Sequence, residues 1–183
     1  NCDSPDEALK ILPTLIGFDL EGVELDANLN LFLRLGYQEP TMEARRHGLE
    51  SLIGKSLTMS LGEAESDTWQ AIKAFDWLDS NNNLFKTATH PESTRKLLEA
   101  LDSNHWKIHL TNGGKTLYLG SNDSANSESL NALLSEHQLT GLQLKGEVIG
   151  QALIGNSSNL PFINRVQQAL DPNGIFEPFS QPI

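Results

Sequence analysis

The chain has 183 residues, which favours one domain of ordinary size, and its hydrophobic fraction of 38% is enough for one core. A formal net charge of -11 disfavours nucleic-acid partners and anionic membrane surfaces, because both carry negative charge themselves. No apolar run is long enough for a membrane span. The single cysteine, Cys2, excludes an internal disulfide, and we expect a cytoplasmic protein, with lipid attachment at Cys2 as the alternative.

The first part of the chain predicts a helix followed by mixed structure. Residues 4–7 have the pattern of a capping box and open a helix with an apolar stripe. Residues 20–25 alternate between polar and apolar side chains and indicate a short strand, whereas residues 29–35 are ambiguous. Residues 41–53 predict a second helix. We interpret residues 1–54 as a helical and mixed segment that packs on the domain that follows it.

From residue 55 onward the predicted order is strand, helix, strand, helix, hairpin, helix, strand, and then a final helix. The hairpin turns at Asn112-Gly113-Gly114, where glycine supplies the positive φ that a tight turn requires. The strands are predicted at 56–61, 84–86, 106–110, 116–119 and 142–145, and the helices at 67–78, 91–101, 127–137 and 161–170. This order is typical of an α+β domain with a ferredoxin-like antiparallel sheet covered by helices, which we place at residues 55–183.

No complete catalytic or metal-binding motif is found. A phosphate loop ending at Gly114-Lys115 would require glycine five residues before Gly114, and His109 stands there. His105 and His109 are four residues apart, but the surrounding hairpin supplies no further histidine or cysteine for a metal. A serine nucleophile elbow and a Rossmann glycine motif are also missing. We therefore assign no catalytic residue and no metal ligand.

Three segments carry a family pattern. In residues 61–70 a predicted strand ends at Gly62, an acidic residue follows, and a helix with Trp69-Gln70 begins. In residues 171–176 the sequence Asp-Pro-Asn-Gly-Ile-Phe follows an amphipathic helix, and residues 108–119 place two strands around a Gly-Gly turn. Together these segments resemble the cap, or substrate, domain of FAD-linked oxidases of the vanillyl-alcohol-oxidase type, nearest to the FAD-binding subunit of glycolate oxidase.

The resemblance implies the cap domain of an oxidoreductase that acts on a small 2-hydroxy acid such as glycolate, not catalytic by itself. FAD would be bound mainly by a flavin-binding domain or subunit, whose Gly-rich pyrophosphate loops are missing from this sequence. His109, Lys115 and Arg165 would face the substrate or the flavin. The family's Asn-Pro-Gly exit reads Glu177-Pro178-Phe179 here, and no catalytic residue is carried over. The alternative is a non-catalytic α+β module that binds a protein partner or a small ligand.

Overall fold

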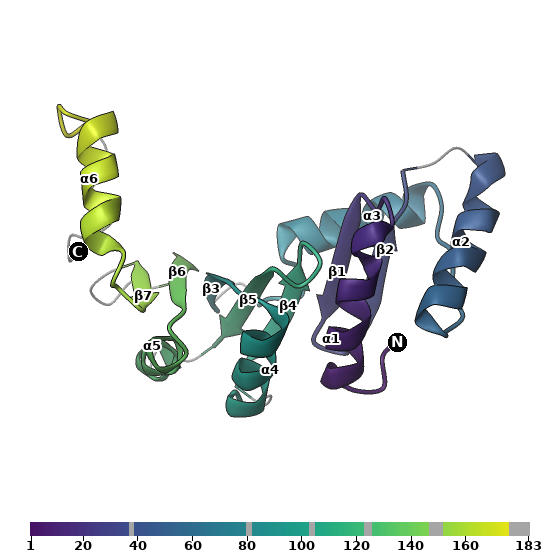
Figure 1. The fold of residues 1–183 in the computed structure, drawn as a ribbon, viewed down its shortest axis with the longest axis horizontal. Coiled ribbons are helices and arrows are strands. Elements are labelled where there is room, and N and C mark those ends of the chain that lie inside the picture. The colour runs from purple at the N-terminus through teal and green to yellow at the C-terminus, as the bar shows by residue number, and fades with distance from the viewer. Residues whose placement is uncertain (37–38, 80–81, 103–104, 123–125, 147–151, 176–183) are drawn as a thin grey trace.

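The computed structural model describes residues 1–36, 39–79, 82–102, 105–122, 126–146 and 152–175. In these residues one seven-stranded antiparallel sheet runs through the molecule in the order β2-β1-β4-β5-β3-β6-β7 (Figure 1). The strands are β1 (Gly22–Asp26), β2 (Leu31–Arg34), β3 (Asn83–Ala88), β4 (Lys107–Thr111), β5 (Thr116–Ser121), β6 (Thr140–Lys145) and β7 (Leu153–Gly155). The helices are α1 (Pro5–Thr14), α2 (Glu39–Ile53), α3 (Glu63–Ala74), α4 (Pro91–Ala100), α5 (Asn126–Glu136) and α6 (Leu160–Leu170). The predicted α+β class, an antiparallel sheet covered by helices, is confirmed.

The centre of the sheet has the β-α-β-β-α-β order of ferredoxin-like domains, formed by β3, α4, β4, β5, α5 and β6. β5 lies between β3 and β4 and pairs with each of them in antiparallel fashion. β1 and β2 extend the sheet beyond β4, and β7 extends it beyond β6. The strands that precede residue 55 therefore belong to the same sheet as the strands that follow it.

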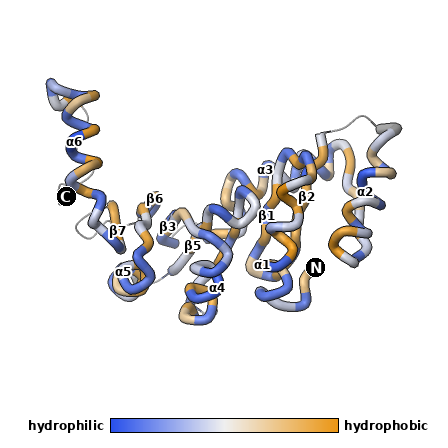
Figure 2. Tube along the Cα trace, in the orientation of Figure 1, coloured by the Kyte–Doolittle hydropathy of each residue, from blue (hydrophilic) through white to orange (hydrophobic). Residues whose placement is uncertain are grey.

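The hydrophobic core lies between one face of the sheet and helices α1, α4 and α5. Because side chains alternate along a strand, every second residue of the central strands points to these helices. Phe85, Leu110 and Leu117 of the strands and Leu97 and Leu134 of the helices are each at most 2% exposed. Figure 2 shows apolar and hydrophilic positions mixed along α1 and α4, as expected for helices with one buried side.

The second face of the sheet is covered by α3 and the turn that follows it. Trp69 of α3 lies over Gly22 of β1, where an added Cβ would come 2.9 Å from the indole ring. α3 ends where Phe75 adopts a left-handed conformation with a φ of 59°. The chain then turns back so that Leu78 lies directly against Gly120 of β5. Glycine at two strand positions thus allows bulky side chains to approach the sheet backbone.

Several sequence predictions need correction. Residues 56–61 form no strand; their alternating apolar side chains line a groove, and the segment is tied to α2 rather than to a neighbouring strand. The strand that the family resemblance places before Gly62 is therefore missing. The helix predicted at 67–78 begins at Glu63 and ends at Ala74, because two acidic residues suit its first turn and the left-handed Phe75 stops it. The ambiguous residues 29–35 contain β2, and the short β7 was not predicted.

Replacing Gly155 by alanine should destabilise the end of the sheet. Gly155 has a φ of 82°, its N–H donates to Oδ1 of Asn131 at 2.7 Å, and an added Cβ would overlap the Leu139 carbonyl and lie 2.7 Å from Cβ of Leu134. We expect urea unfolding to show a loss of about 2–4 kcal/mol, because backbone strain and overpacking add. Gly54→Ala is the matched control, with a φ of 69° and no atom within 4 Å of the added Cβ. It should lose only about 1 kcal/mol, and equal losses would contradict the steric argument.

Candidate functional site

A buried polar cluster lies where β1 adjoins β4, on the second face of the sheet. Nε2 of His109 is 2.8 Å from Oε2 of Glu24, and the Thr111 hydroxyl donates to the other carboxylate oxygen at 2.5 Å. His109 is 3% exposed and Glu24 is 9% exposed. Because a carboxylate only accepts hydrogen bonds, Nε2 of the imidazole is the donor. The residues of two strands far apart in the sequence thus form one oriented carboxylate–imidazole pair.

Trp77 covers this pair. Its ring stacks on the His109 ring, with 5.6 Å between the centroids and 14° between the planes. Nδ1 of His109 and Nε1 of Trp77 are both buried, and neither has a hydrogen-bond partner in the described part of the chain. Buried polar atoms are nearly always paired in folded proteins. The cluster therefore contains two polar positions that the fold itself leaves unsatisfied, which marks it as a candidate site.

The three residues that the family resemblance singles out lie in three different places. His109 is buried on β4, Lys115 is exposed in the turn between β4 and β5, and Arg165 is exposed on α6. α6 follows β7, and strands β5, β3 and β6 lie between β4 and β7 in the sheet (Figure 1). The structure does not bring the three side chains together. The Glu177-Pro178-Phe179 exit lies outside the described residues.

α6 is a second candidate feature, because one of its sides is apolar and exposed. It projects from the β7 end of the sheet, and none of its residues is buried (Figure 1). Phe162, Val166 and Leu170 repeat every four residues on one side and are 61%, 40% and 81% exposed. Asp171 ends the helix, and its Oδ1 accepts a hydrogen bond from the N–H of exposed Ile175 at 2.9 Å. An exposed apolar stripe of this kind marks an interaction surface.

A groove of about 460 Å³ lies at the open edge of β2. β2 forms one wall, and α2, residues 57–62 and α3 form the others. The volume lies within the usual range for small-ligand sites, about 300–1,000 Å³. Most of the lining is apolar and comprises Leu31, Phe32, Leu33, Leu35, Met42, Leu49, Leu57, Met59, Leu61 and Trp69.

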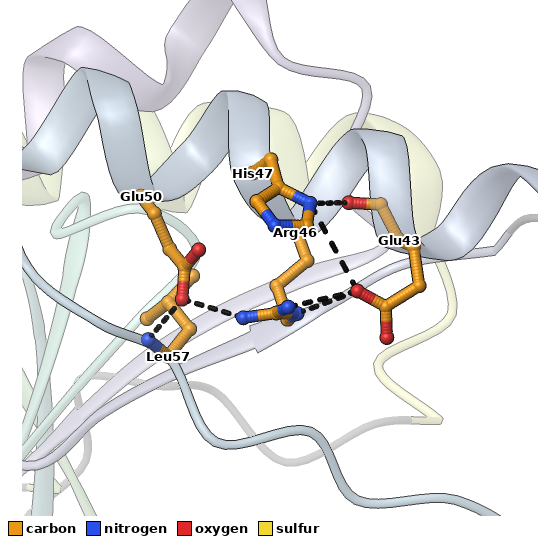
Figure 3. Close-up of polar contacts among 5 residues, drawn as sticks. All are labelled: Glu43, Arg46, His47, Glu50 and Leu57. Carbon is orange, nitrogen blue, oxygen red and sulfur yellow. Dashed lines mark hydrogen bonds and ion pairs between the residues drawn. The ribbon is translucent and has the colours of Figure 1, made fainter.

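Both guanidinium groups that line the groove already bind carboxylates. Arg46 lies 2.8 Å from Glu43 and 2.7 Å from Glu50 along α2 (Figure 3). Arg34 lies 2.8 Å from Glu65, and its guanidinium carbon is 5.5 Å from the centre of the Trp69 ring. The positive charge in the groove is thus neutralised by the chain itself, so a phosphate or carboxylate ligand would have to displace a glutamate.

Glu50 ties α2 to residues 57–62, which form another wall of the groove. Its Oε1 accepts hydrogen bonds from the Leu57 N–H at 2.8 Å and from Arg46 at 2.7 Å (Figure 3). The Leu57 hydrogen bond is the main cause that lowers the pKa of Glu50 below its ordinary value; partial loss of water opposes it, and the charge of Arg46 adds to it. The ionised carboxylate therefore helps to hold residue 57 in place.

We expect the NMR shift of the Leu57 amide proton to titrate with Glu50, with a midpoint below that of an ordinary glutamate. Because the pKa of Glu50 is lowered in the folded state, its contacts stabilise the fold above the unfolded pKa and are lost as the pH falls through the folded pKa. Glu50→Gln should abolish this titration, whereas Glu43→Gln should leave it in place. A midpoint at or above the ordinary value would contradict the prediction.

The histidines outside α2 do not share a metal site. Nδ1 of His105 lies 2.8 Å from Asp102, while His109 bonds to Glu24. Within the described ranges, no group of three or more histidine, cysteine or acidic residues could hold a metal ion.

The helices in the described ranges are too short or too polar to cross a bilayer. Cys2 is buried, and burial raises the pKa of its thiol.

The sequence alone gave no indication that Glu24 pairs with His109. Period-two alternation places each residue on one face of its own strand, but it does not say which strands adjoin.

Neither a family model, nor a curated protein, nor a solved structure matches this chain. Function is therefore inferred from the geometry and from the sequence patterns.

Proposed function

We propose that this chain is the cap, or substrate, domain of an FAD-linked oxidoreductase acting on a small 2-hydroxy acid such as glycolate. The observation that carries the proposal is α6, whose apolar stripe of Phe162, Val166 and Leu170 lies in solvent. An eleven-residue helix gains little stability alone in water, so a packing partner for this stripe is expected. The same helix and its Asp171-Pro172 stop form the segment that resembles the family. The partner is a flavin-binding domain, on the same polypeptide or on a separate subunit.

The sheet supplies a surface that suits a covering role. On the second face, β3 and β6 lie beyond the part covered by α3 and its turn. Lys86 of β3 is exposed there, with its ammonium 5.8 Å from the centre of the Tyr118 ring. Its partner on β6 is Leu142, and Leu144, two residues further along that strand, is 45% exposed. A cap domain of this type orients the substrate and excludes water, while the flavin supplies the redox chemistry.

FAD itself is assigned to the partner domain. A pyrophosphate group is normally bound by backbone N–H groups at a glycine-rich turn before a helix, or by available cations. The two arginines of the groove at β2 are already paired with Glu65, Glu43 and Glu50. The described residues therefore do not fit a complete FAD site.

The three residues implied by the resemblance have different positions in this proposal. Arg165 lies on α6 and would reach the partner domain. Lys115 is exposed in the turn between β4 and β5. His109 would meet a substrate only after Trp77 moved away from the imidazole ring.

The test uses an affinity tag on this chain. The tagged chain is isolated, together with its bound partners, from cells that express the protein naturally. We expect the assembly to show flavin absorption bands and to reduce an electron-accepting dye when glycolate is added. The described domain purified alone should be colourless and inactive. A colourless assembly, or a flavin that glycolate and lactate both leave oxidised, would overturn the proposal.

The alternative, a non-catalytic module that binds a protein partner or a small ligand, is favoured by the groove at β2. That groove has a largely apolar lining and the volume of a ligand site. The absorption spectrum of the isolated assembly separates the two functions, because a binding module needs no flavin.

A further inference from the structure

We propose that the groove at the open edge of β2 binds an extended peptide by adding it to the sheet as a further strand. The peptide has apolar side chains at alternate positions and uncharged side chains between them. The proposal concerns the groove alone and is independent of the flavin-dependent function proposed above.

The backbone of β2 directs hydrogen-bonding groups away from the sheet. Within the described ranges, β2 is the outermost strand on its side of the sheet and pairs only with β1. The N–H of Asp26 donates to the carbonyl of Asn30 at 3.1 Å, so these two residues form a hydrogen-bonded pair. Because hydrogen-bonded and non-hydrogen-bonded pairs alternate between antiparallel strands, the backbone groups of Leu31 and Leu33 point away from β1.

The hydrogen bonding of Val23 indicates the same outward direction for the backbone groups of Leu33. Val23 lies opposite Leu33 in the strand pairing, yet its carbonyl accepts a hydrogen bond from Gly113, on the β4 side, at 3.3 Å. Val23 and Leu33 are therefore a non-hydrogen-bonded pair. Both Leu31 and Leu33 line the groove, and in the part of the chain that the structure describes no partner bonds to their outward N–H and C=O groups.

A peptide strand can satisfy these backbone groups, whereas an apolar small molecule cannot. A small apolar molecule would remove water from them without replacing its hydrogen bonds, which costs about 1–3 kcal/mol for each group. A peptide strand instead donates and accepts at the matching spacing, and its alternate side chains enter the walls on either side. The geometry therefore favours a peptide over an apolar small molecule.

The lining of the groove suits an uncharged peptide with apolar side chains. Met42 and Leu49 of α2 line the groove together with β2, so an occupant of the groove contacts a helix as well as the strand edge. Met59 and Leu61 line another wall, and methionine side chains adapt to varied apolar shapes. Since Arg34 and Arg46 are neutralised, the lining favours an uncharged peptide.

The probe is a fluorescein-labelled heptapeptide of alternating threonine and valine with both ends blocked. We expect saturable binding by fluorescence anisotropy and slower hydrogen exchange of the Leu31 and Leu33 amides on binding. Two further peptides carry N-methyl groups on the valines or on the threonines. Only one of these two should bind, because only one set of N–H groups of an added strand faces β2.

Two protein variants test whether an outward N–H group of β2 contributes to peptide binding. Leu33→Pro removes an outward N–H and keeps the bonds to β1, since proline is tolerated on an edge strand at such a position. We expect it to weaken peptide binding at least about tenfold, and Leu33→Ala, which keeps the N–H, to weaken it less than about threefold. Far-UV circular dichroism checks that both variants are folded.

A charged substitution tests the wall. Met59→Glu places a charge in the lining and should weaken binding, whereas Ile16→Glu, at an exposed apolar residue that does not line the groove, should not. The proposal is overturned if folded wild-type protein shows no saturable binding, or if all three peptides bind equally. A small apolar dye, N-phenyl-1-naphthylamine, gives a further check. If the dye binds wild-type protein but not Met59→Glu, and the peptides bind neither, the groove is a small-molecule site and the proposal is overturned.

Discussion

Replacing His109 by alanine is expected to lower the free energy of unfolding by about 3–5 kcal/mol, because it leaves a buried carboxylate without its partner. Glu24 would keep the hydrogen bond from Thr111 but lose the one from Nε2 of the imidazole, which lies 2.8 Å away. Trp77 would also lose the ring on which it stacks. Urea unfolding at neutral pH measures the loss.

His105→Ala is the matched control. Nδ1 of His105 lies 2.8 Å from Asp102, the same separation as in the buried pair, but the two side chains are 59% and 53% exposed. Exposed pairs of this kind contribute about 0–1 kcal/mol. The two variants therefore differ mainly in the burial of the partner carboxylate. A loss in His109→Ala no larger than that in His105→Ala would show that Glu24 reaches water despite its low exposure.

The contrast between these pairs shows how far the sequence determines the site. His105 and Asp102 are three residues apart, so local structure alone can bring them together. Glu24 and His109 are 85 residues apart, and their contact exists only because β1 adds to the sheet beside β4. Alternation along each strand predicts the face of each residue, whereas the order of strands is set by packing of the whole domain.

The central sheet could be predicted from the sequence because its signals are local. The Asn112-Gly113-Gly114 turn joins two strands with alternating side chains, and all three turn residues have the positive φ that the turn requires. Residues 56–61 have the same alternation, but no strand in the described part of the chain pairs with them. Their apolar side chains face a groove between α2, α3 and β2, and a period of two does not distinguish a groove from a sheet.

The α6 stripe leads to the second large effect. Phe162→Asp combined with Leu170→Asp should leave the stability of the isolated chain within about 0.5 kcal/mol, because both side chains are already in solvent. The same pair should weaken docking on the flavin-binding domain at least about 100-fold, since burial of each side chain contributes about 1.5–3 kcal/mol. The measurement is the amount of flavin recovered per mole of tagged chain.

A second double variant controls for the added charge. Asn164→Asp combined with Gln168→Asp introduces the same charge, but with 3.6 residues per turn these positions lie on the side of α6 opposite Phe162. This variant should retain its flavin-containing partner. In the wild-type assembly the amides of α6 should exchange slowly with solvent, and in the isolated chain they should exchange fast. Equal loss of flavin in both double variants, or slow exchange of α6 in the isolated chain, would contradict docking through the apolar stripe.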